Sequence, residues 1–217
     1  MVAGAGLLAL VLSVILWPVV IFATTVVHEG GHVMTGAAMG GRVKSVKFDR
    51  SGGGATDIAG LGPFGMFLTA LSGYLLPSVF GLVDAALLGH DKVSAVLWLS
   101  LLFLIMMLIQ AGNLMAGFVT VALGTAIVLV MRYTTAGAQA FFAYTWTWLL
   151  LFGGFGGVLV LQAVRRAGED GRSDAYRLRK ATLLPASLWS GFFWLTSIVA
   201  MGFGAGILLG LVTVRLR

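Results

Sequence analysis

The sequence predicts an all-α polytopic membrane protein, with about six transmembrane helices and a small β-hairpin after the first. Hydrophobic residues make up 59% of the 217 residues and charged residues only 10%, whereas a soluble domain has about 25% charged residues. The mean hydropathy is +1.01, and the apolar residues form long unbroken stretches, the signal of membrane-spanning helices. We therefore expect a single membrane-embedded domain over residues 1–217.

The expected spans follow directly from these apolar stretches. The stretch Val93–Met131 is about twice as long as the 20 residues that one crossing needs. We divide it at its only polar break, Gln110–Asn113, into two short spans, with a re-entrant arrangement as the alternative. The six spans are then expected at about Leu7–Met39, Phe64–Leu88, the two halves of Val93–Met131, Ala138–Val164 and Leu183–Val214.

Two polar segments interrupt the apolar pattern. The first, residues 40–62, contains Arg42–Phe48, in which polar and apolar residues alternate as they do in a strand. A turn at Asp49–Gly54 and a second short strand at Ala55–Ile58 complete a hairpin, whose first strand we expect to keep one free edge. The second polar segment, residues 165–182, precedes the last span.

The distribution of Lys and Arg predicts the orientation of the chain in a cell membrane. Six spans place both termini on one side, together with Lys92, Arg132, Arg215 and Arg217. The other ten of the 14 basic residues then lie on the opposite side, which the positive-inside rule makes cytoplasmic: Arg42, Lys44, Lys47, Arg50, Arg165, Arg166, Arg172, Arg177, Arg179 and Lys180. Orientation thus accounts for the net charge of +6, and no nucleic-acid partner is expected. The bias toward Ala, Gly, Val and Arg indicates a bacterial origin.

The end of the first span carries an HExxH pattern, His28-Glu29-Gly30-Gly31-His32. On a helix, two histidines at i and i+4 share one face, so both imidazoles can bind one tetrahedral Zn²⁺. The intervening glutamate can act as a general base toward water that the metal activates. Ionisable groups at membrane depth are costly and by default functional. The alternative is a polar cluster that packs helices.

Catalytic zinc needs a third protein ligand and an open coordination position. The chain has no cysteine, and the remaining histidine, His90, falls on the far side of the membrane. The residue types and the topology leave six candidates: Asp49, Asp57, Asn113, Glu169, Asp170 and Asp174. For Asp174 the competing interpretation is a first-turn acid that favours the helix dipole behind an N-cap Ser173.

The chain resembles the site-2 protease family of intramembrane zinc metalloproteases, in particular its small bacterial branch without a PDZ domain. The resemblance rests on the HExxH pattern at the end of the first span, on Gly40-Gly41-Arg42-Val43 and on the strand-like stretch that follows. Near the carboxyl end it rests on Ser173-Asp174-Ala175, Leu178, Thr182-Leu-Leu-Pro185 and Trp189. The Asn-Pro-x-Pro-Leu-Asp-Gly type of motif that supplies an aspartate ligand in the family is missing.

The resemblance implies a zinc site formed by His28, His32 and Asp174, with Glu29 as the catalytic base. It also implies cleavage of transmembrane protein substrates within or near the lipid bilayer. A hairpin in this family adds the unwound substrate as an edge strand, a form of β-augmentation. The residues expected to contact substrate are Val43, Ser45, Val46 and Asn113.

The sequence thus favours an intramembrane zinc metalloendopeptidase, with its active site toward the cytoplasm. The alternative is a non-proteolytic, metal-containing membrane binding protein, against which the intact Glu29 argues because a structural zinc needs no base. A transporter is a weaker interpretation, because we find no paired interrupted helices and no inverted repeat.

Overall fold

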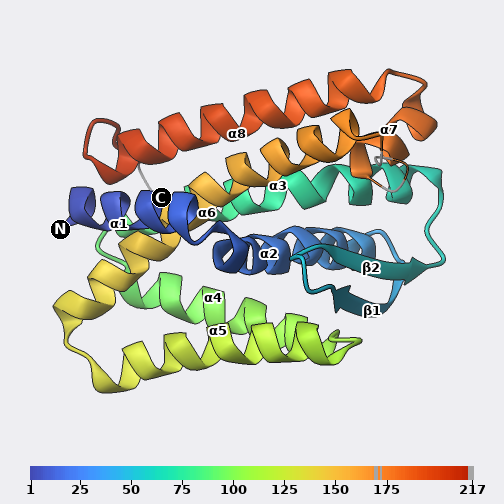
Figure 1. Ribbon diagram of the computed structural model, residues 1–217. Helices are drawn as coiled ribbons and strands as arrows, with labels where there is room; N and C mark the ends of the chain where they lie inside the picture. Colours follow the sequence, from blue (N-terminus) through green and yellow to red (C-terminus); the bar gives the residue numbers. More distant parts are fainter. Residues whose placement is uncertain (169–170, 172, 215–217) are drawn as a thin grey trace.

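The computed structural model describes residues 1–168, 171 and 173–214. It is a bundle of helices with one two-stranded antiparallel sheet (Figure 1). The elements in chain order are α1 (Val2–Ile15), α2 (Trp17–Ala38), β1 (Arg42–Phe48), β2 (Gly54–Ala59), α3 (Pro63–Leu88), α4 (Val93–Ile109), α5 (Leu114–Tyr133), α6 (Ala136–Arg166), α7 (Asp174–Thr182) and α8 (Ala186–Leu208).

The first expected span is broken into two helices. α1 ends at Ile15 and α2 begins at Trp17, and the two helices are bent by 105°. Pro18 lies in the first turn of α2, where its missing N–H and fixed φ suit a helix start and disfavour an unbroken helix that continues from α1. The expectation of one continuous helix over Leu7–Met39 is therefore wrong.

The number of spans is also revised. Among the described residues, four helices are long and apolar enough to cross a membrane: α3, α5, α6 and α8. The bent pair α1–α2 raises the count to five if it forms one span, and α4, with 17 residues, is a shorter apolar helix. The chain is a multi-pass membrane protein with a hairpin, as predicted, but the count of six spans is not confirmed.

The polar connections gather at the two ends of the bundle. The hairpin, the α4–α5 turn and α7 lie together at one end, and the N-terminus lies at the other (Figure 1). At this second end, His90 in the α3–α4 turn contacts the carbonyl oxygen of Val214 through its Nε2 at 2.6 Å. This arrangement agrees with the prediction that the hairpin and residues 165–182 share one side.

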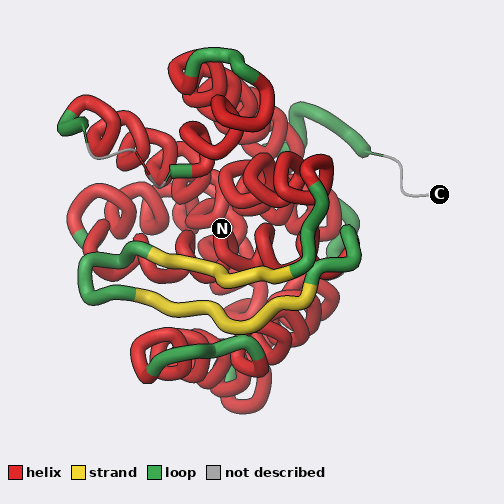
Figure 2. The backbone as a smooth tube through the Cα atoms, turned by 90° about the vertical axis from the view of Figure 1, so that its right-hand side faces the viewer, coloured by secondary structure: helices red, strands yellow, loops and turns green. Residues whose placement is uncertain are grey.

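The hairpin lies across the helix ends (Figure 2), and hydrogen bonds join its β1 strand to the α4–α5 turn. β1 pairs with β2 in the register Val46↔Thr56, with an irregularity between Val43 and Ser45. On its other edge, the Val46 N–H donates to Gln110 O and the Val46 carbonyl accepts from Gly112 N, both at 2.7 Å.

Asn113 extends this edge pairing with its side chain. Its Oδ1 accepts from Phe48 N at 3.2 Å and its Nδ2 donates to Phe48 O at 2.7 Å. The expectation of a free edge on Arg42–Phe48 is therefore wrong at Val46 and Phe48, because the α4–α5 turn occupies it. The edge of the sheet that faces away from the α4–α5 turn, which we call the outer edge, belongs to β2.

The two central residues of the HExxH pattern are glycines because neighbouring helices lie against them. A Cβ on Gly31 would stand 2.7 Å from the carbonyl oxygen of Ser72 in α3, and one on Gly30 would stand 2.2 Å from Cζ of Phe103 in α4. Small residues of this kind let helices in a membrane approach closely. The close contact with α3 fixes the height and rotation of α2, and with them the positions of the two histidines.

We predict that Gly31→Ala destabilises the protein by about 1–3 kcal/mol, the usual cost of overpacking, because the new methyl group meets backbone rather than a movable side chain. Thermal unfolding in detergent micelles measures the effect. Gly191→Ala in α8 is the matched control, since nothing lies within 4 Å of a Cβ there. It should leave the midpoint unchanged or raise it, and equal midpoints for Gly31→Ala and wild type would contradict the packing interpretation.

Candidate metal centre

The two histidines of the pattern point to the same place. His28 and His32 lie one turn apart on α2, and their Nε2 atoms are 3.2 Å from each other. Gly73 of α3 stands directly behind both rings, because a Cβ there would lie 2.6 Å from His32 Cε1 and 2.7 Å from His28 Cε1. Any larger residue at position 73 would push the rings apart.

A backbone contact from α3 determines which ring nitrogen of neutral His32 carries the proton. Its Nδ1 lies 2.7 Å from the carbonyl oxygen of Thr69. Since a carbonyl only accepts, Nδ1 carries a proton and donates it to this contact. In the neutral form of the ring, the form that binds a metal, Nε2 therefore keeps its lone pair. This is the arrangement found around metal-bound histidines, in which the second nitrogen is tied to a carbonyl or carboxylate. His28 packs edge-on against Tyr74, with ring centroids 4.6 Å apart.

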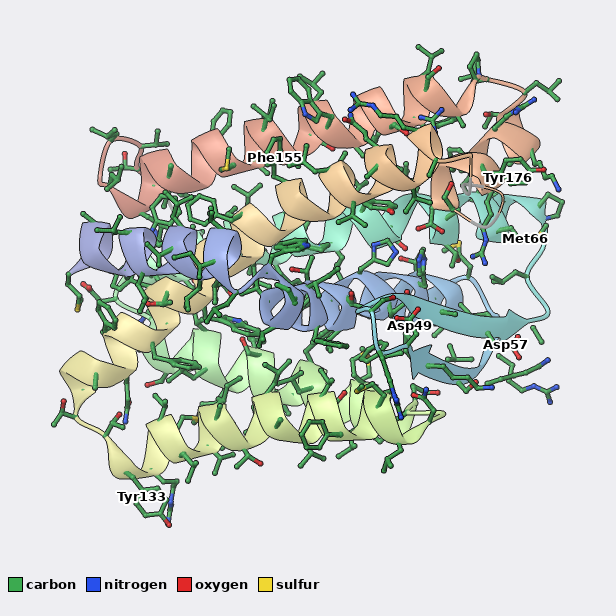
Figure 3. The ribbon with its side chains drawn as sticks, in the orientation of Figure 1. Asp49, Asp57, Met66, Tyr133, Phe155 and Tyr176 are labelled. Carbon is green, nitrogen blue, oxygen red and sulfur yellow. The ribbon has the colours of Figure 1, made fainter. Side chains whose placement is uncertain are left out.

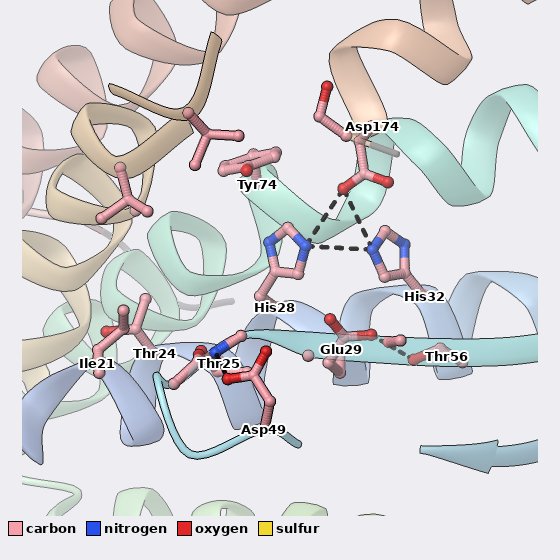
Figure 4. A pocket seen from close by; sticks show the side chains of 18 of the residues that line it. Ile21, Thr24, Thr25, His28, Glu29, His32, Asp49, Thr56, Tyr74 and Asp174 are labelled. Atoms are coloured by element: carbon pink, nitrogen blue, oxygen red, sulfur yellow. Dashed lines mark hydrogen bonds and ion pairs between the residues drawn. The ribbon is translucent and has the colours of Figure 1, made fainter. Parts of the chain in front are cut away.

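Asp174 completes a triangle with these two nitrogens. Its Oδ2 lies 3.2 Å from Nε2 of His28 and 3.2 Å from Nε2 of His32 (Figure 4). In a tetrahedral site with metal–ligand distances of about 2.0–2.2 Å, neighbouring ligand atoms stand about 3.3–3.6 Å apart. Three potential ligand atoms thus converge at nearly the spacing that Zn²⁺ requires, and the residues fit the metal.

Glu29 offers a competing third ligand. One ligand atom each of His28, Glu29 and His32 lie within 4.8 Å of one another, which is a looser group than the triangle with Asp174. The Glu29 carboxylate is also already engaged, because its Oε2 accepts a hydrogen bond of 2.5 Å from the Thr56 hydroxyl (Figure 4). We therefore favour Asp174 as the ligand and Glu29 as the neighbouring acid.

Packing and capping hold Asp174 in place at the start of α7. The Ser173 hydroxyl accepts from Tyr176 N at 3.2 Å and caps the helix, as expected for the competing interpretation of this segment. Ala175 and Leu178 are fully buried in a cluster with Phe193 of α8 and with residues of α3 and α6. The N-cap and the metal-facing carboxylate are thus compatible roles of one helix start.

The turn after α7 explains other residues on which the family resemblance rests. The Trp189 indole N–H donates to the Thr182 hydroxyl at 3.1 Å, and that hydroxyl donates to Leu178 O at 2.7 Å. Leu183 adopts a left-handed conformation with φ of 63° and ends the helix. Together with Pro185 before α8, these contacts fix the angle at which α7 approaches α2 and α3.

Asp174 is an anion at neutral pH. Its burial by itself would raise the pKa of the carboxyl, but charge and hydrogen bonding from His32 and His28 outweigh burial and bring the pKa well below its usual value. Arg177, one turn further along α7, adds a positive charge 3.8 Å from Oδ1. A charged carboxylate is the form that binds a metal ion.

The other candidates for the third ligand are occupied elsewhere. Asp49 holds the hairpin turn by accepting from Ser51 Oγ, Ser51 N and Gly53 N, and these hydrogen bonds, the Ser51 hydroxyl foremost, lower its pKa. Asp57 lies 3.6 Å from Lys44, and Asn113 binds Phe48. Asp49 and Asp57 both lie on the hairpin (Figure 3). Glu169 and Asp170 fall outside the described residues.

Two cavities meet at this site. The first, of 780 Å³, is lined by His28, Glu29 and Asp174, by the hairpin turn and by part of α6. The second, of 990 Å³, runs between β2, the start of α3 and α7. Both are bordered by His32, Thr56 and Arg177, so the path past β2 leads directly to the histidines. The expected substrate contacts Val43, Ser45, Val46 and Asn113 border neither cavity.

Several residues that shape this site were not predicted from the sequence. Thr56, Thr69 and Gly73 act through a hydroxyl, a backbone carbonyl and a missing side chain. None of these gives a composition signal in an apolar or strand-like segment. The only hint available was the high content of 31 glycines, which indicates close packing but not its position.

A multi-pass membrane protein with an HExxH helix and a nearby carboxylate has the features of a metallopeptidase. In a comparison with family models, residues 1–204 match the Peptidase M50B-like family. The chain therefore belongs to this family of metallopeptidases, which confirms the resemblance to the site-2 proteases. Comparisons with curated proteins and with solved structures gave no match.

We predict that Asp174→Ala lowers the zinc content of the purified protein from about one ion per chain to a small fraction, because two histidines alone leave the site one ligand short. Metal analysis by mass spectrometry measures this. Asp57→Ala, which removes an exposed carboxylate paired with Lys44, is the control and should keep its zinc. Retention of zinc by Asp174→Ala, together with its loss in Glu29→Ala, would assign the third ligand to Glu29 instead.

Proposed function

We propose that the chain is an intramembrane zinc endopeptidase that hydrolyses peptide bonds of membrane proteins within or near the bilayer. The observation that carries this proposal is the triangle of His28, His32 and Asp174 with the Glu29 carboxylate beside it. The pattern combines metal ligands with an acid that is not needed to bind the metal. A purely structural zinc site would not need such an acid.

The chemistry divides between the metal and the chain. When bound, zinc supplies a Lewis acid that polarises the scissile carbonyl and activates water at neutral pH. His28, His32 and Asp174 would hold the ion. Glu29 takes a proton from the attacking water, whose oxygen bonds to the carbonyl carbon, and delivers that proton to the amine as the C–N bond breaks. Tyr74 and Gly73 keep the two imidazoles oriented.

The substrate must present its scissile bond in an extended form, because helical backbone is folded into internal hydrogen bonds. We propose that the substrate adds to β2 as an edge strand. Backbone groups in an antiparallel pair point alternately toward and away from the partner. The backbone N–H and C=O groups of Val46 and Phe48 point away from β2, toward the α4–α5 turn. The residues opposite them on β2, Thr56 and Gly54, therefore point their own N–H and C=O groups away from β1, toward the outer edge of the sheet. No described residue forms a hydrogen bond with these outward-pointing backbone groups.

This proposal moves the substrate contact from β1 to β2. Val46 and Asn113 support it indirectly, because they fasten β1 and so hold the hairpin in position. Val43 and Ser45 lie near Val46 on β1. The second cavity, bordered by β2 and α7, provides the room for an extended segment, and the His32 side of that cavity leads to the metal-binding residues.

We further propose that the protein lies in a bacterial cell membrane with its site toward the cytoplasm. The support is the ten-to-four division of basic residues, which follows the positive-inside rule. The gathering of the hairpin, the α4–α5 turn and α7 at one end of the bundle agrees with this division. In this orientation the polar hairpin faces the cytoplasm, and water can reach the site from that side.

We predict that Glu29→Gln keeps zinc but loses turnover by a factor of about 10²–10⁴, the usual contribution of general acid–base catalysis, whereas His28→Ala loses both metal and activity. Each variant is co-expressed with tagged single-span membrane proteins, and a fragment specific to the wild type is sought. Equal processing by wild type and Glu29→Gln would contradict the protease proposal and favour a metal-containing binding protein.

We predict the topology from single cysteines, which the cysteine-free chain allows. Lys92→Cys should react with a membrane-impermeant maleimide in intact spheroplasts. Ser51→Cys, in the hairpin turn, should react only after permeabilisation, because the hairpin faces the cytoplasm. The reverse pattern would overturn the proposed orientation.

A further inference from the structure

The Glu29 carboxylate is held from two sides by β2. Its Oε2 accepts the hydrogen bond from the Thr56 hydroxyl at 2.5 Å. Its Oε1 lies over Gly54, where an added Cβ would stand 2.5 Å away, with Glu29 Cγ at 2.6 Å and Cδ at 2.8 Å. Glu29 is only 2% exposed. Its carboxylate therefore occupies a position that the hairpin, rather than its own helix, defines.

Such a position matters because a glutamate side chain is flexible. A general base must lie within about 2.6–3.2 Å of the proton that it abstracts, and a free glutamate samples many rotamers. Thr56 is suited to hold it, since its β-branched side chain is stiff at χ1 and its hydroxyl has one donor to give. The hydrogen bond occupies Oε2 and leaves Oε1 for the proton transfer.

We propose that Thr56 is a positioning residue for the catalytic base and that Gly54 provides the space for the base. This inference rests on the proposed protease function. Thr56 and Gly54 are also the β2 residues whose backbone groups face the outer edge. One strand thus receives the substrate and orients Glu29, so that the base is aligned with the bond that the strand presents.

A purely structural role for Thr56 would give a different mutational order. Valine matches the shape of threonine and is at least as good a strand former, whereas serine keeps the hydroxyl but is a poorer one. If Thr56 only stabilises the strand, Thr56→Val should be active and Thr56→Ser impaired. If its hydroxyl positions Glu29, the order reverses.

The kinetic test uses the full-length protein in proteoliposomes, with the single-span substrate that wild type cuts and Glu29→Gln does not. We expect Thr56→Val to lower kcat about 10- to 100-fold, the factor associated with a lost hydrogen bond to a charged group, with KM and zinc content unchanged. Thr56→Ser should stay within a few-fold of wild type. Full activity of Thr56→Val, or greater impairment of Thr56→Ser, would overturn the proposal while leaving the protease function intact.

A second pair of variants tests the space over Gly54. Gly54→Ala should lower kcat to a similar degree, because its methyl group displaces the Glu29 carboxylate. Gly62→Ala is the control, since nothing lies within 4 Å of a Cβ there, and it should behave as wild type. Wild-type activity of Gly54→Ala would contradict the role assigned to Gly54.

A thermal-unfolding cycle tests the contact without any substrate. Glu29→Ala, Thr56→Val and the double variant should show effects on stability that do not add, because the two residues share one hydrogen bond. Additive effects would overturn the proposed contact even if the protein is a protease. Equal processing of substrates by wild type and Glu29→Gln would instead reject the protease function, and the cycle would still report on the Thr56–Glu29 contact.

Discussion

The convergence of two imidazole nitrogens and a carboxylate oxygen within 3.2 Å of one another is the constraint on which the structure depends. Lone pairs at this distance repel unless a cation or protons lie between them. The surrounding helices hold these three atoms close together. α3 contributes the Thr69 carbonyl and the space at Gly73, α7 is held by its buried Ala175 and Leu178, and the glycines of the HExxH pattern let α2 approach its neighbours.

Among the described residues, the hairpin is attached to the helices along its β1 edge but not along the outer edge of β2, and this difference decides where a substrate strand can add. β1 is bound to the α4–α5 turn through Val46 and Phe48, while the turn beyond it is tied to α2 by the hydrogen bond of 2.6 Å from Thr25 to Gly52 O. Gly52 allows that docking because it has a φ of +88° and lies against Ile21. β2 is left as the strand with outward backbone groups. A sheet fastened on one side in this way can accept a strand only on the side that borders the site.

Sequence reasoning reached those features that rest on local periodicity. The i, i+4 spacing placed His28 and His32 together, and the alternation in Arg42–Phe48 gave the bounds of β1. Asp174 was only one of six candidates on residue type and topology, because its approach to α2 depends on contacts among α3, α6 and α8 that no local pattern records. The same reason explains two features that were missed. The break at Leu16 depends on the direction in which α1 packs before Pro18. The pairing along the edge of β1 depends on the Gln110–Asn113 segment, which is distant in the sequence.

The central claim is that His28, His32 and Asp174 bind one zinc ion. Crystals of the zinc-loaded protein, measured on both sides of the zinc absorption edge, test it most directly. We predict one anomalous peak enclosed by the two Nε2 atoms and a carboxylate oxygen of Asp174, at about 2.0–2.2 Å from each, with Glu29 outside the coordination sphere. A peak coordinated by Glu29 in place of Asp174, or no peak between the histidines, would contradict it.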